Sequence, residues 1–157
     1  MKYIVSKHCG FCSGVKRAVE SAYKNAGENT VTYGELIHNK IVVDKLAEKG
    51  VTAVNDISQC IGKKVIVRSH GAGKDFFDKA SALGIEVIDA TCPFVKKIHD
   101  IVYRHYIDGY HIAIIGKAGH PEVEGTNGWC ENTASIVDDE KAAEALVHFE
   151  RVCFVTQ

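Results

Sequence analysis

The chain has 157 residues, enough for one hydrophobic core or for two small lobes that share one. Its apolar content of 46% and charged content of 25% are typical of a globular protein, and 19 Lys+Arg against 20 Asp+Glu leave a formal charge of −1. This balance argues against a nucleic-acid-binding protein, and no apolar run approaches the length of a membrane span.

Short apolar runs alternate with segments of helical period along the chain. The expected strands are Tyr3–Ser6, Val31–Leu36, Val65–Arg68, Glu86–Ile88, His111–Ile115, Ser135–Val137 and Val152–Val155. The expected helices are Val15–Ala26, Ile41–Lys49, Lys74–Leu83, Phe94–Tyr106 and Asp139–His148. This alternation predicts an α/β chain with mainly parallel sheets.

One short pattern occurs twice. Residues 12–17 and 92–97 both read Cys-x-x-Val-Lys-basic, and each copy opens a predicted helix. The repeat predicts two similar strand–helix lobes, residues 1–92 and 93–157, the second of them incomplete.

Five side chains that can bind metal or phosphate lie just after predicted strands: Cys12, His38, His70, Cys92 and His120. In open parallel sheets, ligands bind outside the carboxyl ends of the strands. A single one of these residues could be an ordinary loop residue, but five together predict one shared site.

The cysteines allow more than one interpretation. Cys9 and Cys12 form a Cys-x-x-Cys, but a structural zinc site needs four ligands and no second such pair exists, so zinc is not favoured. A redox-active dithiol of Cys9 and Cys12 stays open. Cys12 and Cys92 as ligands of one iron–sulfur cluster fit the repeat better. Three further cysteines are predicted to pack as small apolar residues: Cys60, Cys130 and Cys153. The first residues do not resemble an export signal, so reduced thiols and a cytoplasmic location are expected.

The histidines are accompanied by glycine. His70 and His120 lie in two predicted loops, residues 69–74 and 116–126, where backbone amides can approach an anion. His38 precedes a predicted helix start, where free N–H groups bind phosphate. Three such histidines suit a diphosphate, and no nucleotide-binding glycine motif is present. Glu122 could donate a proton if burial raises its pKa, although an exposed loop carboxylate is the commoner case.

Five motifs occur in an order typical of one family: Gly10–Val15, Ile37–Asn39, Ser69–Gly71, Asp89–Pro93 and Gly119–Gly125. They resemble the LytB-type 4-hydroxy-3-methylbut-2-enyl diphosphate reductases, and the resemblance runs from one end of the chain to the other. It implies a three-lobed iron–sulfur reductase fold, of which this chain would form two lobes.

The resemblance also implies a reaction and a role for each site residue. The reaction is reductive dehydroxylation of 4-hydroxy-3-methylbut-2-enyl diphosphate, the last step of the non-mevalonate isoprenoid pathway, with ferredoxin or flavodoxin as electron donor. Cys12 and Cys92 would be ligands of a 4Fe-4S cluster. The diphosphate would be bound by His38, His70 and His120, and Glu122 with His120 would deliver protons.

Members of this family are about twice as long as this chain. The resemblance therefore implies that the third cysteine ligand lies outside it, and the chain alone is expected to lack substantial reductase activity. Two alternatives remain: a non-catalytic phosphate-binding α/β module, and a thiol oxidoreductase based on Cys9 and Cys12.

Overall fold

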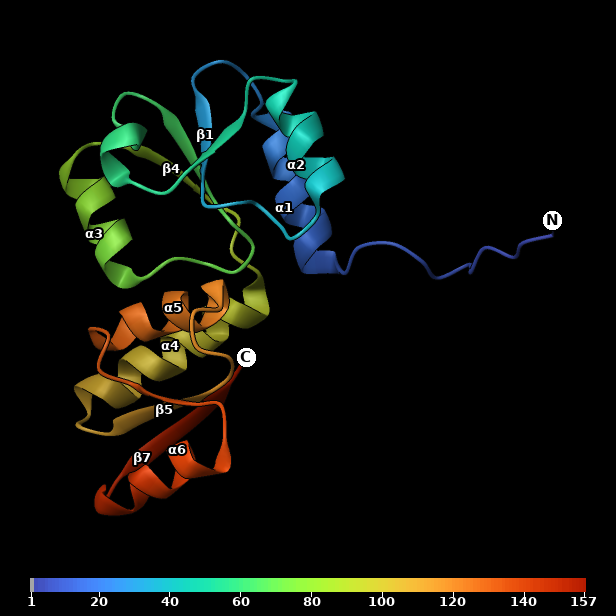
Figure 1. Cartoon of the computed structure of the whole chain (residues 1–157). Helices are drawn as coiled ribbons and strands as arrows, with labels where there is room; N and C mark the ends of the chain where they lie inside the picture. Colours follow the sequence, from blue (N-terminus) through green and yellow to red (C-terminus); the bar gives the residue numbers. More distant parts are fainter. Residues whose placement is uncertain (1) are drawn as a thin grey trace.

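The computed structural model describes residues 2–157 and contains two lobes, one after the other along the chain (Figure 1). Each lobe is built on a fully parallel sheet, which confirms the predicted α/β class. The segment before the first helix extends away from both lobes (Figure 1). Within the described residues, no helix has the length and apolar character needed to cross a membrane.

The first lobe has the strand order β2-β1-β3-β4. Its strands are β1 (Thr30–Tyr33), β2 (Thr52–Val54), β3 (Lys64–Val67) and β4 (Glu86–Asp89). The helices around them are α1 (Ser13–Lys24), α2 (Lys40–Ala47), the 3-10 helix η1 (Ile57–Cys60) and α3 (Lys74–Ala82). In β3, Val65 and Val67 pack on the side of α3, whereas Ile66 packs on the side of α1 and α2. A strand covered on both faces favours apolar residues at successive positions, which explains the unbroken run Val65–Val67 in the sequence.

The second lobe has the strand order β6-β5-β7. Its strands are β5 (His111–Ile115), β6 (Ser135–Val137) and β7 (Val152–Thr156). Its helices are α4 (Pro93–Ile107), α5 (Pro121–Asn127), the 3-10 helix η2 (Gly128–Cys130), α6 (Glu140–Glu144) and the 3-10 helix η3 (Ala145–His148). In both lobes the first strand lies between the second and the third, so the two lobes share one arrangement of three strands.

Helix α4 carries the chain from β4 of the first sheet to β5 of the second. It begins at Pro93, directly after Cys92, which is its N-cap. We propose that the first lobe ends at residue 92 and the second begins at residue 93. Helix α4 nevertheless also contacts the first lobe, because the His99 ring lies against Gly71.

The predicted strand Tyr3–Ser6 is wrong. Residues 2–12 contain no helix or strand, and the side chains of Tyr3, Ile4 and Val5 are 84%, 99% and 68% exposed. An extended segment forms a strand only when a neighbour pairs with its backbone groups, and none does so between residues 2 and 157. Cys12 therefore follows no strand, and it is placed by α1 alone.

Four elements are absent from the sequence prediction: β2, α5 and the 3-10 helices η1 and η2. Strand β2 has only three residues, and α5 lies in a segment predicted as a glycine-rich loop. Helix α5 forms there because Pro121 occupies its first turn and the His120 side chain caps it. The helix predicted at Asp139–His148 is divided into α6 and η3.

Candidate functional site

Three loops meet at the carboxyl edge of the first sheet, after β1, β3 and β4. Ser69, after β3, donates its N–H and its hydroxyl to the carbonyl of Leu36, after β1, at 3.2 and 3.3 Å. The N–H of Cys92, after β4, donates in turn to the carbonyl of Ser69 at 2.9 Å. Since these three strands are neighbours in the sheet, their loops are tied side by side.

The three predicted histidines lie together. The ring centroids of His38 and His70 are 4.5 Å apart, and His120 is 5.8 Å from each of them. His38 and His70 belong to the first lobe, whereas His120 is the N-cap of α5 in the second. The cluster therefore exists only where the two lobes meet.

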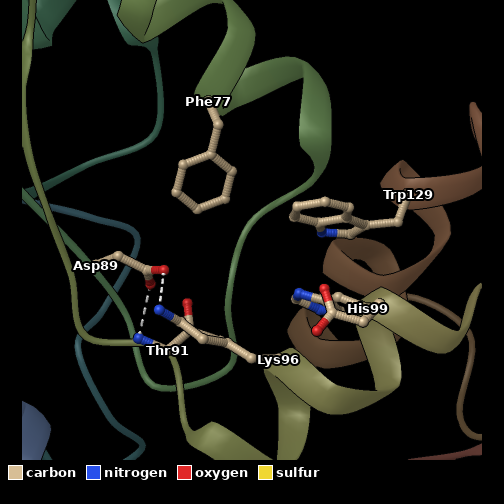
Figure 2. Close-up of a pocket in the computed structure, with 7 residues that line it drawn as sticks. Phe77, Asp89, Thr91, Lys96, His99 and Trp129 are labelled. Atoms are coloured by element: carbon tan, nitrogen blue, oxygen red, sulfur yellow. Dashed lines mark hydrogen bonds and ion pairs between the residues drawn. The ribbon is translucent and has the colours of Figure 1, made fainter. Parts of the chain in front are cut away.

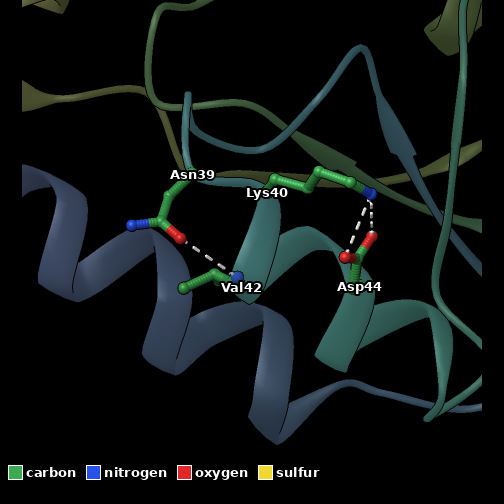
Figure 3. Close-up of polar contacts among 4 residues, drawn as sticks. All are labelled: Asn39, Lys40, Val42 and Asp44. Atoms are coloured by element: carbon green, nitrogen blue, oxygen red, sulfur yellow. Dashed lines mark hydrogen bonds and ion pairs between the residues drawn. The ribbon is translucent and has the colours of Figure 1, made fainter.

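The start of α2 fixes the loop that carries His38. The Asn39 side chain accepts a hydrogen bond from the Val42 N–H at 3.2 Å and so caps the helix (Figure 3). One residue further on, Lys40 forms an exposed ion pair with Asp44 at 2.9 Å (Figure 3). His38 itself is exposed, so its ring is accessible to a ligand.

His70 is half-buried. Burial, together with the nearby His38 and Arg68, lowers its pKa to about 4. The ring is therefore neutral at pH 7 and acts as a hydrogen-bond donor rather than as a charge. Its Nδ1 atom is buried without a hydrogen-bond partner. Such an atom is costly to leave unpaired, so its presence here calls for an explanation, and a bound ligand would provide one.

His120 and Glu122 form one small unit at the start of α5. The Glu122 N–H donates to His120 Nδ1 at 3.2 Å, which leaves the ring proton on Nε2. Burial raises the pKa of the Glu122 carboxyl, and His120 opposes this shift. A carboxyl group with a raised pKa holds its proton closer to neutral pH, which a proton donor requires.

Arg68 lies beside the cluster and was not predicted from the sequence. Its guanidinium donates to the carbonyl of Gly71 at 3.3 Å and to that of Pro121, in the second lobe, at 3.5 Å. It is half-buried, and burial lowers its pKa. The sequence could have indicated Arg68 only by its position, directly after β3 and directly before the Ser69-His70-Gly71 motif.

Cys12 and Cys92 are the N-caps of α1 and α4, and neither helix has a side-chain hydrogen bond at its cap. The Cys92 thiol lies against the first turn of α1, because a Cβ built on Gly14 would be only 2.6 Å from its sulfur. Arg17 of α1 also donates to the Thr91 carbonyl, beside Cys92. Two thiols at neighbouring helix N-termini fit two ligands of an iron–sulfur cluster, because the free N–H groups favour thiolates.

No group of three or more potential metal ligands occurs in the part of the chain that the structure describes. Cys9 is exposed in the segment before α1 and completes no such group. Cys60 and Cys130 are fully buried, which confirms their interpretation as core residues, and Cys153 is half-buried. Burial raises the pKa of all three thiols, so they stay protonated.

Comparison with known protein families gives a consistent result. A family model described as LytB protein matches residues 3–157. The 4-hydroxy-3-methylbut-2-enyl diphosphate reductase of Thermoanaerobacter sp. (strain X514) is 45% identical over 164 residues, covering 100% of this chain and 57% of that protein. The enzyme of the same name from Clostridioides difficile (strain 630) is 41% identical, and the match covers 100% of this chain and 58% of that protein.

Two solved structures have the same fold. The E-1-hydroxy-2-methyl-but-2-enyl-4-diphosphate reductase from Plasmodium falciparum superposes with a TM-score of 0.88 at 30% identity, covering 96% of this chain and 49% of that one. An (E)-4-hydroxy-3-methyl-but-2-enyl diphosphate reductase superposes with a TM-score of 0.78 at 38% identity, covering 98% of this chain and 57% of that one. The chain thus spans about half the length of the proteins that it matches.

Proposed function

The chain belongs to the LytB family, and we propose that it supplies the diphosphate-binding part of a 4-hydroxy-3-methylbut-2-enyl diphosphate reductase. The observation that best supports this proposal is the cluster of His38, His70 and His120, drawn from two lobes. Several ring N–H donors within one small volume suit the closely spaced oxygens of a diphosphate. The family relatives carry this enzyme name.

In the proposed reaction, 4-hydroxy-3-methylbut-2-enyl diphosphate takes up two electrons and two protons. Its hydroxyl group leaves as water, and isopentenyl or dimethylallyl diphosphate is formed. The three histidines bind and orient the diphosphate, with the Nε2–H of His120 and the neutral ring of His70 as donors. Arg68 adds a fixed positive charge beside them.

Glu122 is the proposed proton donor to the leaving hydroxyl. Burial raises the pKa of its carboxyl group and also limits the access of water. His120 keeps Glu122 in place, since its Nδ1 accepts the Glu122 N–H. Replacing a general acid of this kind lowers turnover by about 10² or more.

Cys12 and Cys92 would hold a 4Fe-4S cluster through thiolates at the N-termini of α1 and α4. Such a cluster, when bound, supplies electrons and an iron that polarises the substrate hydroxyl. We propose that the third cysteine comes from outside these 157 residues, and that a ferredoxin or flavodoxin delivers the electrons. A cytoplasmic location keeps these thiols reduced. Alone, the chain is expected to have no substantial reductase activity.

The first experiment is anaerobic iron–sulfur reconstitution, read by iron content and visible absorbance. We expect uptake to depend on both Cys12 and Cys92, so Cys12→Ser and Cys92→Ser should each lower it, whereas Cys9→Ser should not. Cluster uptake that is independent of Cys92 but depends on Cys9 would contradict the proposed ligand pair. Retained dithiol reactivity in Cys92→Ser would then favour a thiol oxidoreductase.

The second experiment is calorimetric titration with inorganic diphosphate. His70→Ala and His120→Ala should each weaken binding by at least about tenfold, the effect of losing one good charge-assisted hydrogen bond. His148→Ala, an exposed histidine of η3, is the control and should bind as the parent chain does. Diphosphate binding without cluster uptake in any variant would favour the non-catalytic phosphate-binding module.

A further inference from the structure

Where the two lobes meet, their backbones touch without intervening side chains. A Cβ built on Gly128 would lie 2.5 Å from the Cα of Gly73, and one built on Gly73 would lie 3.1 Å from the Cα of Gly128. A Cβ on Gly125 would lie 3.4 Å from the carbonyl oxygen of His70. At Gly73 and Gly128 only glycine allows the two backbones to approach this closely, whereas a Cβ on Gly125 would make an ordinary van der Waals contact. Gly71, Gly73, Gly125 and Gly128 are called the glycine seam here.

Two aromatic side chains of the second lobe, His99 and Trp129, also contact the loop that contains Gly71 and Gly73. Trp129 Nε1 donates to the carbonyl of Ala72 at 3.0 Å. Its ring stacks on that of His99, with centroids 5.2 Å apart and an interplanar angle of 21° (Figure 2). The His99 ring in turn lies against Gly71, where a Cβ would be 2.5 Å from its Cε1 atom.

His99 and Trp129 also close one side of a cavity of about 260 Å³ between the lobes, with Phe77 of α3 across from them (Figure 2). His99 is 3% exposed, and its Nε2 atom has no hydrogen-bond partner. A buried, unpaired histidine reduces stability, so a purely structural core position would be better filled by an apolar residue.

His70 and His120 are each close in sequence to glycines of the seam. His70 precedes Gly71, and His120 begins the short helix α5, which ends just before Gly128. Helix α5 is only seven residues long, about two turns, so its two ends move together as one short rigid element. The distance between His70 and His120 is therefore set by the contact at the seam.

We propose that the glycine seam is the positioning device of the three-histidine site: it holds the loop of His70 against α5 and so makes one anion-binding site from two lobes. Gly73 and Gly128 are positioning residues, since neither is among the histidines that bind the ligand. The inference rests on the proposed role of those histidines in binding diphosphate.

The test uses the 157-residue chain and its single tryptophan, Trp129, which reports on the seam without any ligand. Gly73→Ala and Gly128→Ala add a methyl group from opposite sides of the contact. Both should move the Trp129 emission to longer wavelength and weaken inorganic diphosphate binding by at least about tenfold, since small displacements of binding groups are costly. Gly27→Ala is the matched control, because a Cβ there meets nothing within 4 Å.

Gly125→Ala is a second control, within the seam itself, because its Cβ would make only ordinary van der Waals contacts at 3.4 Å. It should fold with emission and affinity close to those of the parent, and Gly73→Ala carries the test if Gly128→Ala does not fold. The proposal is overturned if Gly73→Ala and Gly128→Ala fold with parental emission and parental affinity, or if Gly27→Ala loses as much affinity as they do. A parental chain that does not bind inorganic diphosphate would refute the proposed function instead, and unchanged Trp129 emission in the variants would then overturn the seam separately.

Discussion

At the scale of single residues, burial keeps two histidines neutral. The pKa of His70 and that of His99 are each lowered to about 4, with loss of water as the largest cause for both. For His99, Asp89 and Asp100 partly oppose this shift. In the unfolded chain a histidine takes up its proton near pH 6.5. As the pH falls from about 6.5 to about 4, the unfolded state therefore binds more protons than the folded state, and the free energy of unfolding decreases.

His99→Gln should remove part of this pH dependence. Glutamine does not titrate, and the parental histidine lowers the free energy of unfolding by about 2 kcal/mol when the pH is lowered to about 5. Urea unfolding at about pH 7.5 and about pH 5 measures the difference. His148→Gln, at an exposed position, should behave as the parent does, and a parental pH dependence in His99→Gln would contradict the assignment.

Glu122→Gln should stabilise the chain at neutral pH. The folded-state pKa of Glu122 is raised, so its contribution to stability is present at low pH and is lost as the pH rises through that pKa. Glutamine mimics the protonated carboxyl, and the gain should therefore disappear in acid. Glu124→Gln, at an exposed position of the same helix, tests whether the effect belongs to the half-buried site. A loss of stability in Glu122→Gln at pH 7 would argue against a proton donor here.

The sequence identifies some site residues better than others. His38, His70 and His120 can be found because each lies in a glycine- or cap-containing motif after a strand. Arg68 has no motif of its own, and its hydrogen bonds to the carbonyls of Gly71 and Pro121 depend on how the two lobes meet. His99 lies on the apolar face of α4, where a sequence pattern cannot distinguish a packing residue from a positioning one.

At the scale of elements, the start of α2 offers a separate test of the His38 loop. Asn39→Ala removes the cap to the Val42 N–H, and should lower the free energy of unfolding by about 1 kcal/mol. It should also weaken diphosphate binding, because His38 is the residue directly before the cap. Thermal or urea unfolding and calorimetric titration measure the two effects.

Two further variants make this result specific. Asn39→Ser keeps a side-chain acceptor at the cap and should restore most of both losses. Lys40→Ala removes only an exposed ion pair with side chains 87% and 54% exposed, so a change below about 0.5 kcal/mol is expected. Equal effects of Asn39→Ser and Asn39→Ala would show that capping does not position His38.

The accuracy of element prediction follows from how each element is stabilised. Strands β5 and β6 were predicted with their observed bounds because both are short apolar runs within clear polar limits. Tyr3–Ser6 has the same pattern, yet a strand needs a partner, which its own residues do not reveal. Helix α5 was missed because its start depends on the side chain of His120 and not on apolar periodicity.

At the scale of the whole molecule, the site joins the two lobes. The first lobe contributes His38, His70 and Arg68, and the second contributes His120 and Glu122. The repeated Cys-x-x-Val-Lys motif indicated two lobes, and both sheets do share one strand arrangement. The sequence could not show that glycines on both sides bring the lobes together, because an interface is a property of two distant segments.

Since both lobes contribute histidines, diphosphate should stabilise them as one unit. A ligand at a hundred times its Kd raises the free energy of unfolding by about 2.7 kcal/mol. Urea unfolding followed by Trp129 fluorescence, which reports on the seam, and by far-UV circular dichroism, which reports on both lobes, should give coincident transitions that inorganic diphosphate shifts equally. His38→Ala and His120→Ala, one from each lobe, should both reduce the shift to about half or less, whereas His148→Ala should retain it. Two separate transitions, only one of which moves with ligand, would place the binding site within a single lobe and contradict an interlobe site.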